Sequence, residues 1–439
     1  MVETLIQTLE IGRIFQIIID VLTTALTFFV YLIWVVPLIA LVNLRKIELQ
    51  KQYIKKFNWQ LFELKIPKQN IKTPKAMEQV LVSLYAMRAS LDPEEVWLEG
   101  KVCPWMSLEI ISSKNGIRFF IYAPDNQRNL IESSFFSQYP DIEINVVEDY
   151  TKEMPLNLQD GEYDLYGADL VLAAPNPYPI KTYPYFFEGG KTINEEKRAD
   201  PISIISEVMS NLKSDERIWI QILIQPAEDV LKKEGEKIIN KIIGKKAEDK
   251  KTSPIITLID SIISFLKDLV VALYSSLASS AKESKSDEKP QIKFLAPNEE
   301  LVVKAVLNKM SKLAYKTIIR FLYIDKKSDF TGKNIGAIFG AFRQFGDWTL
   351  NGLKPQDKTK TSKPRFFVFF RNQIFLKRKK DIYENYLSRS FPSYSYFPYA
   401  DIFEPSVLNV EEIATIFHLP IDQLVEASGL RRVEAQRGS

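Results

Sequence analysis

Residues 108–122 read LEIISSKNGIRFFIY and decide the fold of the first half of the chain. Two strand-like runs, Leu108–Ser112 and Ile117–Tyr122, flank Lys114-Asn115-Gly116. An Asn-Gly pair between two such runs is a strong hairpin signal, because both residues tolerate positive φ. The stretch therefore predicts an antiparallel hairpin, and the neighbouring segments have to supply its partners.

The segments around this hairpin predict a complete α+β module. Trp59–Ile66 is a strand candidate, and Thr73-Pro74 starts a helix with an N-cap followed by proline. A second helix follows Asp125, and residues 142–146 alternate between apolar and polar side chains as a half-buried strand does. The order β-α-β-β-α-β is that of a ferredoxin-like module, which we expect at residues 58–150.

A second module with the same order of elements is expected at residues 160–390. Its predicted strands and helices are Leu165–Leu172, a helix after Asp200-Pro201, Ile218–Ile224, Tyr315–Ile324, a helix at Ile335–Phe342, and Arg365–Phe370 as the fourth strand. A helical insertion at residues 227–312 replaces the tight turn of its central hairpin. The predicted body is therefore a tandem of ferredoxin-like modules.

The front of the chain predicts one transmembrane helix. Val21–Val42 holds no charged side chain, and a helix of that length spans about 33 Å, enough for a bilayer core of about 30 Å. Val21, Phe28, Trp34 and Val42 mark this membrane anchor. Residues 1–20 would then form a short extracytoplasmic tail.

Charges beside the anchor predict its orientation. The basic neck at residues 43–57 carries Arg45, Lys46, Lys51, Lys55 and Lys56. Lys/Arg excess marks the cytoplasmic flank, so we expect an outside N-terminus, a cytoplasmic body and a single pass through the cell membrane. A cleaved signal peptide fits less well, because the run is long and no basic segment precedes it.

Composition and motifs argue against enzyme chemistry. The chain has 439 residues, a net charge of +3, one cysteine (Cys103) and one histidine (His418), which exclude an internal disulfide and a Cys/His zinc cluster. No GxxxxGK[ST], GxGxxG or GxSxG pattern occurs in a suitable context. We therefore predict no catalytic, cofactor-binding or metal-binding residues, interpret His418 as structural, and place Glu411 and Glu412 on a solvated face.

Residues 255–277 within the insertion predict an amphipathic helix. Its apolar side includes Ile259, Ile262, Leu266 and Leu269. One interpretation is an arm of a helical hairpin packed on residues 230–243 and 301–313. The other is docking onto a membrane surface or a partner helix.

A basic region at residues 354–380 is the candidate nucleic-acid contact. It ends in Lys377, Arg378, Lys379 and Lys380, and an aromatic-rich stretch at residues 394–403 follows. Basic groups beside aromatics can follow a nucleic-acid strand and stack its bases. The alternative is a solvated helix edge with a packed loop.

Residues 407–420, VLNVEEIATIFHLP, carry a resemblance to a known family. They resemble the segment that precedes the motor domain in transfer ATPases of conjugation and type IV secretion. Asn409 would be the N-cap and Glu412 its capping-box partner in the short helix of a C-terminal linker, residues 391–439. The front of the chain and residues 97–150 resemble an uncharacterised family of membrane-anchored proteins from candidate-phyla bacteria.

The resemblance implies a role without catalysis, because no position of this sequence matches the Walker residues. We expect a membrane-anchored scaffold or assembly subunit of a DNA or protein translocation machine, which positions a cytoplasmic ATPase and can form a homo-oligomer. The alternative is a membrane-tethered nucleic-acid-binding protein that uses residues 354–380. An enzyme of unfamiliar type is the third hypothesis.

Overall fold

The structure is a computed structural model. It describes residues 2–67, 69–113, 116–154, 161–187, 199–227, 230–243, 296–364, 370–389, 391, 404–421, 430 and 432–433.

A ten-stranded sheet runs through the described residues, with β10-β1-β3-β2-β6-β7-β5-β8 as its main order. In addition, β4 pairs with β1 and β9 pairs with β7. The strands are β1 (Trp59–Pro67), β2 (Met106–Ser113), β3 (Gly116–Pro124), β4 (Glu143–Val147), β5 (Tyr163–Leu172), β6 (Arg217–Pro226), β7 (Ala314–Lys326), β8 (Leu353–Pro355), β9 (Ser406–Asn409) and β10 (Arg432–Val433).

The sheet consists of two halves with the same topology. The first half has the order β4-β1-β3-β2, and the second has β8-β5-β7-β6. Both are the antiparallel 4-1-3-2 order of a ferredoxin-like module. Antiparallel pairing of β2 with β6, from Met106↔Ile224 to Ile111↔Trp219, joins them into one continuous α+β sheet.

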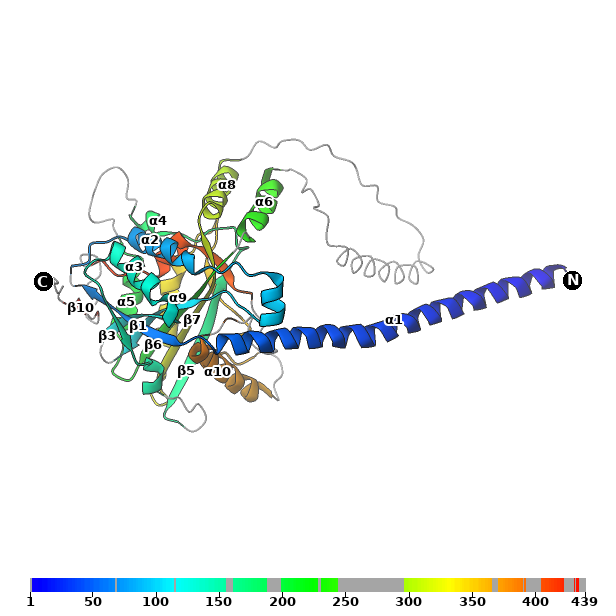
Figure 1. The fold of residues 1–439 in the computed structure, drawn as a ribbon, viewed down its shortest axis with the longest axis horizontal. Coiled ribbons are helices and arrows are strands. Elements are labelled where there is room, and N and C mark those ends of the chain that lie inside the picture. Colours follow the sequence, from blue (N-terminus) through cyan, green and yellow to red (C-terminus); the bar gives the residue numbers. More distant parts are fainter. Residues whose placement is uncertain are drawn as a thin grey trace.

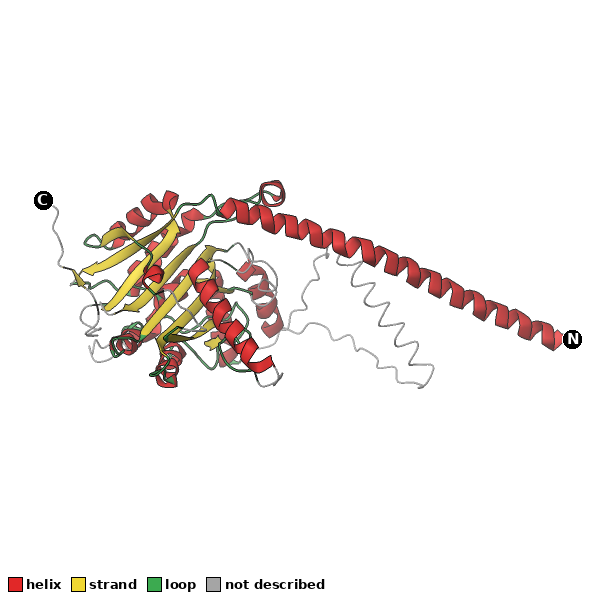
Figure 2. Cartoon of the chain, turned by 90° about the horizontal axis from the view of Figure 1, so that it is seen from below, coloured by secondary structure: helices red, strands yellow, loops and turns green. Residues whose placement is uncertain are grey.

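Helices cover both faces of this sheet (Figures 1 and 2). The larger apolar core lies beneath α2, α3, α5, α9 and α11, and a second core lies beneath α10. The helices are α1 (Val2–Ile54), α2 (Pro74–Leu84), α3 (Arg128–Gln138), α4 (Tyr183–Phe187), α5 (Ser203–Ser210), α6 (Val230–Ile243), α8 (Pro297–Met310), α9 (Gly332–Arg343), α10 (Arg371–Ser388) and α11 (Val410–Ile416).

The predicted hairpin is confirmed: β2 pairs with β3 up to Ser113↔Gly116, and Gly116 has a φ of 94°. The fourth strand of the second half differs from the prediction, which placed it at Arg365–Phe370. Residues 353–355 form β8 on β5, whereas 365–369 lie outside the described residues. Gln356 and Thr361 donate backbone hydrogen bonds to Asp169 and Gly167 of β5, so the chain continues along that edge after β8.

The prediction of a transmembrane helix is also corrected by the structure. Val21–Val42 is the middle of α1, a helix of 53 residues that leaves the body as one rod (Figure 2). Among the described residues, no helix combines the length and the apolar character that crossing a bilayer requires. The membrane anchor at Val21, Phe28, Trp34 and Val42, the single-pass topology and the cell-membrane location are therefore wrong.

The basic neck has a structural role instead of a topological one. Lys46 Nζ lies 4.4 Å from the centre of the Trp97 ring, and the end of α1 packs against the short helical turn at residues 95–99. Gly100 ends that turn at a φ of 68°, and a Cβ there would lie 2.4 Å from the Leu49 backbone. Glycine at this position therefore lets α1 approach the body. Arg45, Lys51, Lys55 and Lys56 are exposed or half-buried on the same segment.

The insertion leaves the sheet between β6 and β7 as two helices. Figure 1 shows α6 and α8 side by side, projecting from the body. A Cβ on Gly235 would meet the Met310 sulfur at 2.1 Å, so glycine permits the close crossing of the two helices. The predicted helix with Ile259, Ile262, Leu266 and Leu269 lies outside the described residues.

Candidate functional site

A row of buried polar side chains crosses the centre of the sheet. Asp169 on β5, Arg320 on β7, Gln221 on β6 and Glu109 on β2 are consecutive register partners, and all four are fully buried. Arg320 donates to Asp169 Oδ1 at 2.8 Å and to Gln221 Oε1 at 3.1 Å. Gln221 in turn donates to Glu109 Oε1 at 3.2 Å, so the row spans the junction of the two halves.

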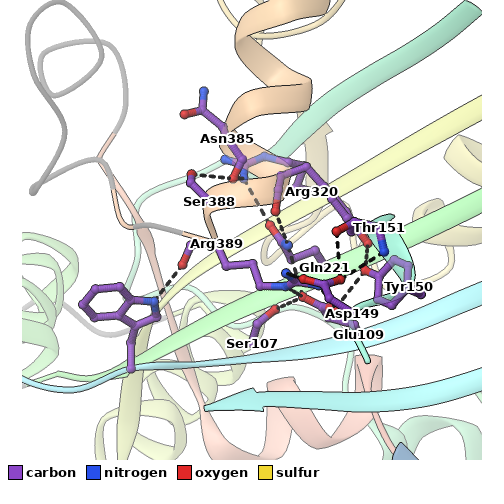
Figure 3. Close-up of polar contacts among 12 residues, drawn as sticks. Ser107, Glu109, Asp149, Tyr150, Thr151, Gln221, Arg320, Asn385, Ser388 and Arg389 are labelled. Atoms are coloured by element: carbon purple, nitrogen blue, oxygen red, sulfur yellow. Dashed lines mark hydrogen bonds and ion pairs between the residues drawn. The ribbon is translucent and has the colours of Figure 1, made fainter. Parts of the chain in front are cut away.

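Arg389, just after α10, completes this network (Figure 3). Its Nε donates to Glu109 Oε1 at 2.6 Å and its Nη2 to Glu109 Oε2 at 3.1 Å. The same guanidinium donates to both carboxylate oxygens of Asp149, at 2.7 and 3.1 Å. Bidentate pairing of this kind is the strongest geometry that a guanidinium can make with a carboxylate.

The network holds the C-terminal end of α10. The carbonyl oxygens of Asn385, Tyr386 and Arg389 accept from Arg320 at 2.7 Å, Gln221 at 3.0 Å and Trp105 at 2.7 Å. The last carbonyls of a helix lack partners within it and carry its partial negative charge. Donors on β7, on β6 and just before β2 therefore dock α10 by its end, and Arg389, with a φ of 47°, ends the helix.

Two tyrosines close the network from the second core. Tyr150 donates to Glu109 Oε2 at 2.8 Å, and its hydroxyl lies 2.6 Å from that of Tyr386. Burial, followed by the charge of Glu109, raises the pKa of both phenols well above the ordinary value. Both hydroxyls are thus neutral and take part in hydrogen bonds. This arrangement suits a structural role better than acid–base chemistry.

A second buried ionic cluster joins α8 to α11. Lys309 Nζ lies 3.1 Å from both carboxylate oxygens of Glu412, and both side chains are fully buried. Glu412 also accepts from the Asn409 and Ile180 amides, at 2.8 and 2.9 Å. Burial raises the pKa of Glu412 and lowers that of Lys309, while their mutual attraction opposes both shifts.

The neighbouring residues extend this cluster to α2. Lys312 forms ion pairs with Glu411 and, at 3.3 Å, with Glu78. Tyr183 donates to Glu78 at 2.6 Å. Glu411 and Glu412 are therefore buried partners of lysines, and their predicted placement on a solvated face is wrong. The predicted capping box between Asn409 and Glu412 is confirmed.

His418 makes a buried contact with Asp200. Its Nδ1 lies 2.9 Å from the Ala414 carbonyl oxygen, and its Nε2 lies 2.6 Å from Asp200 Oδ1. Burial alone would raise the pKa of Asp200. The charge and hydrogen bond of His418, with the amides of Ile421 and Ile202, hold that pKa below its ordinary value. Both ring nitrogens of His418 thus face oxygen atoms, and its contact with Asp200 ties the tail to the start of α5.

The basic cluster predicted for nucleic acid is divided by the fold. Lys379 is buried, its Nζ lying 2.5 Å from Asp164 Oδ1 and 4.3 Å from the centre of the Phe375 ring. Arg378 donates to the Ser362 carbonyl at 3.0 Å. Lys377 and Lys380 are exposed, and Lys380 lies 3.7 Å from Glu384. Two of the four residues thus hold α10 to the body.

We predict that Lys379→Met destabilises the protein by about 1.5–3 kcal/mol, because Asp164 loses a charged hydrogen-bond partner. Lys377→Gln, two residues away and exposed, is the matched control and should leave the unfolding midpoint unchanged. Urea denaturation followed by tryptophan fluorescence measures both. Equal midpoints for the two variants would contradict the structural role of Lys379.

Several buried carboxylates predict loss of stability in acid. Burial alone would raise the pKa values of Glu78, Asp149 and Asp200, but hydrogen bonds and nearby cations outweigh it and hold all three below their ordinary values. The unfolded chain then binds more protons than the folded chain below its own carboxyl pKa values of about 4. We expect the urea midpoint to fall between pH 5 and pH 3, and Asp149→Asn should flatten this dependence. A midpoint independent of pH in that range would refute it.

The residues of the central network were not predicted from the sequence. The sequence does contain a signal for those on the strands, because each is a polar residue within an apolar run. Glu109 comes directly before Ile110, Gln221 lies between Ile220 and Ile222, and Arg320 lies between Ile319 and Phe321. A charged residue inside a buried run needs a partner. The partners, however, come from four strands and from Arg389, which no local pattern connects. Among the described residues, no group of three or more His, Cys, Asp or Glu side chains is arranged to hold a metal ion.

Comparison with known proteins assigns no activity. A family model described as Domain of unknown function (DUF8128) matches residues 45–357, more than half of the chain. No curated protein matches. The matched region contains the eight strands β1 to β8, whereas α10, β9 and α11, which complete both ionic clusters, lie after it.

Proposed function

We propose, from the premise that the chain belongs to the family Domain of unknown function (DUF8128), that it is a non-catalytic scaffold. In this role it serves as an assembly subunit of a DNA or protein translocation machine and positions a motor ATPase. The function rests on how the tail is held, and it needs no chemistry from the buried clusters.

The observation that carries the proposal is the placement of residues 406–421. In the transfer ATPases that they resemble, the corresponding segment leads into the motor. Here β9 pairs with β7 from Ala314↔Asn409 to Thr317↔Ser406, and every residue of α11 is buried. The segment is thus fixed to the sheet, as a part that orients another protein must be.

Ion pairs strengthen this placement at two points. Glu412 binds Lys309 at the base of the projecting α6–α8 pair, and His418 binds Asp200 beside α5. Buried ion pairs favour one geometry over its alternatives in some proteins, although they contribute little net stability. This supports a scaffold in which the α6–α8 pair and residues 406–421 keep fixed positions relative to each other while a partner hydrolyses nucleotide.

The test is co-purification with any Walker-motif ATPase that a neighbouring gene encodes. We expect a stable complex in gel filtration, a changed ATPase rate for the partner, and no ATP hydrolysis by the chain alone. Lys377→Gln/Lys380→Gln should bind the ATPase as the unchanged chain does. Recovery of free chain and free ATPase in separate peaks would overturn the proposal. Loss of salt-sensitive DNA binding in the double variant would support the nucleic-acid alternative instead.

A further inference from the structure

The strand β4 leaves one edge of the sheet open among the described strands. β4 pairs through Leu61↔Val147 to Lys65↔Glu143 with β1 and with no other described strand. β10 pairs with Ile66 and Pro67, beyond the part of β1 that β4 covers. An open edge presents unpaired N–H and C=O groups, which another strand can bind.

The opposite edge of the sheet is protected, and β4 is not. β8 has three residues and ends in Pro355, and Gln356 and Thr361 donate to β5 past its end. Short length, proline and a covering loop are ordinary ways to block an edge. β4 contains no proline or glycine, and its charged residue Glu143 is neutralised by Lys65 at 2.9 Å.

The residues of β4 are complementary to themselves. An antiparallel pair of two β4 strands centred on Asn145 places Glu143 opposite Val147 and Ile144 opposite Val146. In that register, paired residues differ by an even number of positions. The N–H and C=O groups that point away from β1 on one strand therefore meet the equivalent groups of the other strand. Like charges do not face each other within the strand, and all five residues pair.

The same register matches the two faces of the sheet. Ile144 and Val146 lie opposite Leu64 and Phe62, on the face of the larger core. Val146 is 45% exposed, which is high for valine in a strand, and Ile144 of another copy would cover it. Cross-strand apolar pairs of this kind contribute about 0.2–1 kcal/mol each.

We propose that β4 pairs antiparallel with β4 of a second copy of this chain, across a two-fold axis at Asn145. The two sheets then form one continuous sheet in which corresponding faces of the two copies lie on the same side. The contact is isologous, as expected for a closed dimer. It does not depend on the ATPase partner proposed above.

Cysteine cross-linking of the full-length chain tests the register. In a Cys103→Ser background, Asn145→Cys places two thiols directly opposite, with Cα atoms about 4.5–5.5 Å apart, within disulfide range. We expect a disulfide-linked dimer under mild oxidation. Val146→Cys, whose partner is Ile144, and Lys354→Cys, at the centre of the protected strand β8, are the controls and should cross-link at least tenfold less. Equal cross-linking of all three variants would overturn the proposal.

Light scattering after gel filtration measures the dimer without a cross-link. Val146→Lys adds a charge on each side of the two-fold axis at an already exposed position, so the variant should fold and elute as a monomer. Circular dichroism checks the fold. A native dimer that survives Val146→Lys, or a native chain that is monomeric at high micromolar concentration, would overturn the proposal.

Discussion

Replacing Arg389 by methionine is expected to cost at least about 3–5 kcal/mol of stability, the usual penalty for breaking a buried ion pair. Glu109 is fully buried and would keep only neutral donors, while Asp149 would lose both of its guanidinium hydrogen bonds. Burial alone would lower the pKa of Arg389, but the charge of Glu109 raises it well above its ordinary value. The loss should appear as a large fall in the urea unfolding midpoint.

The control for this prediction also removes the charge of Glu109, which loses its cation when Arg389 is replaced. In Arg389→Met/Glu109→Gln, the glutamine keeps an acceptor for Ser107, so we expect the double variant to recover a large part of the loss. Arg389→Lys keeps the charge but cannot make a bidentate pair with either carboxylate, and should lie between the wild type and Arg389→Met. A single variant as stable as the wild type would show that the network does not hold the two halves together.

Apart from β8, the strands of both halves could be predicted because their signals are local. Ile218, Ile220, Ile222 and Ile224 alternate along one strand, and the Asn-Gly turn marks the hairpin before Gly116. A period of two reports which face of a strand is buried. It does not report which strands become neighbours, and the β2–β6 junction between the halves appeared only in the structure.

Other expectations failed where long-range contacts decide the outcome. Residues 353–355 are too few for a periodic signal, and they form β8 because β5 offers an edge there. Adjacent acids such as Glu411 and Glu412 usually face solvent, but here lysines from α8 and the loop after it neutralise them. The prediction at residues 21–42 failed for another reason: the run lies within one helix of 53 residues, and no helix among the described residues is long and apolar enough to cross a bilayer.

The candidate site was predictable only in part, for the same reason. The capping box of Asn409 and Glu412 lies within four residues and could be predicted from the sequence. The second role of Glu412, as partner of Lys309, joins residues more than 100 positions apart. One residue thus combines a local signal with a long-range one, and only the local signal could be predicted.

The two roles of Glu412 can be separated by experiment. Lys309→Met should destabilise the protein by about 3–5 kcal/mol, because it leaves a fully buried carboxylate without its cation. Glu412→Gln alone keeps the capping-box side chain, since glutamine also serves at this helix position. The double variant Lys309→Met/Glu412→Gln should therefore recover most of the loss, and the unfolding midpoints of the three variants give the coupling directly.

The pH dependence of Lys309→Met provides a check that a purely steric loss would not produce. Burial already raises the pKa of Glu412 with Lys309 present, and removing the lysine removes the main opposing charge. The folded variant then takes up a proton at Glu412 more readily than the unfolded chain, whose glutamate pKa is about 4.3. Lowering the pH toward 5 should therefore narrow the gap in midpoint between Lys309→Met and the wild type, and the double variant, which lacks the carboxylate, should show no such narrowing. A gap that stays constant from pH 8 to pH 5 would mean that the cost lies in packing around α8 and not in the buried charge of α11.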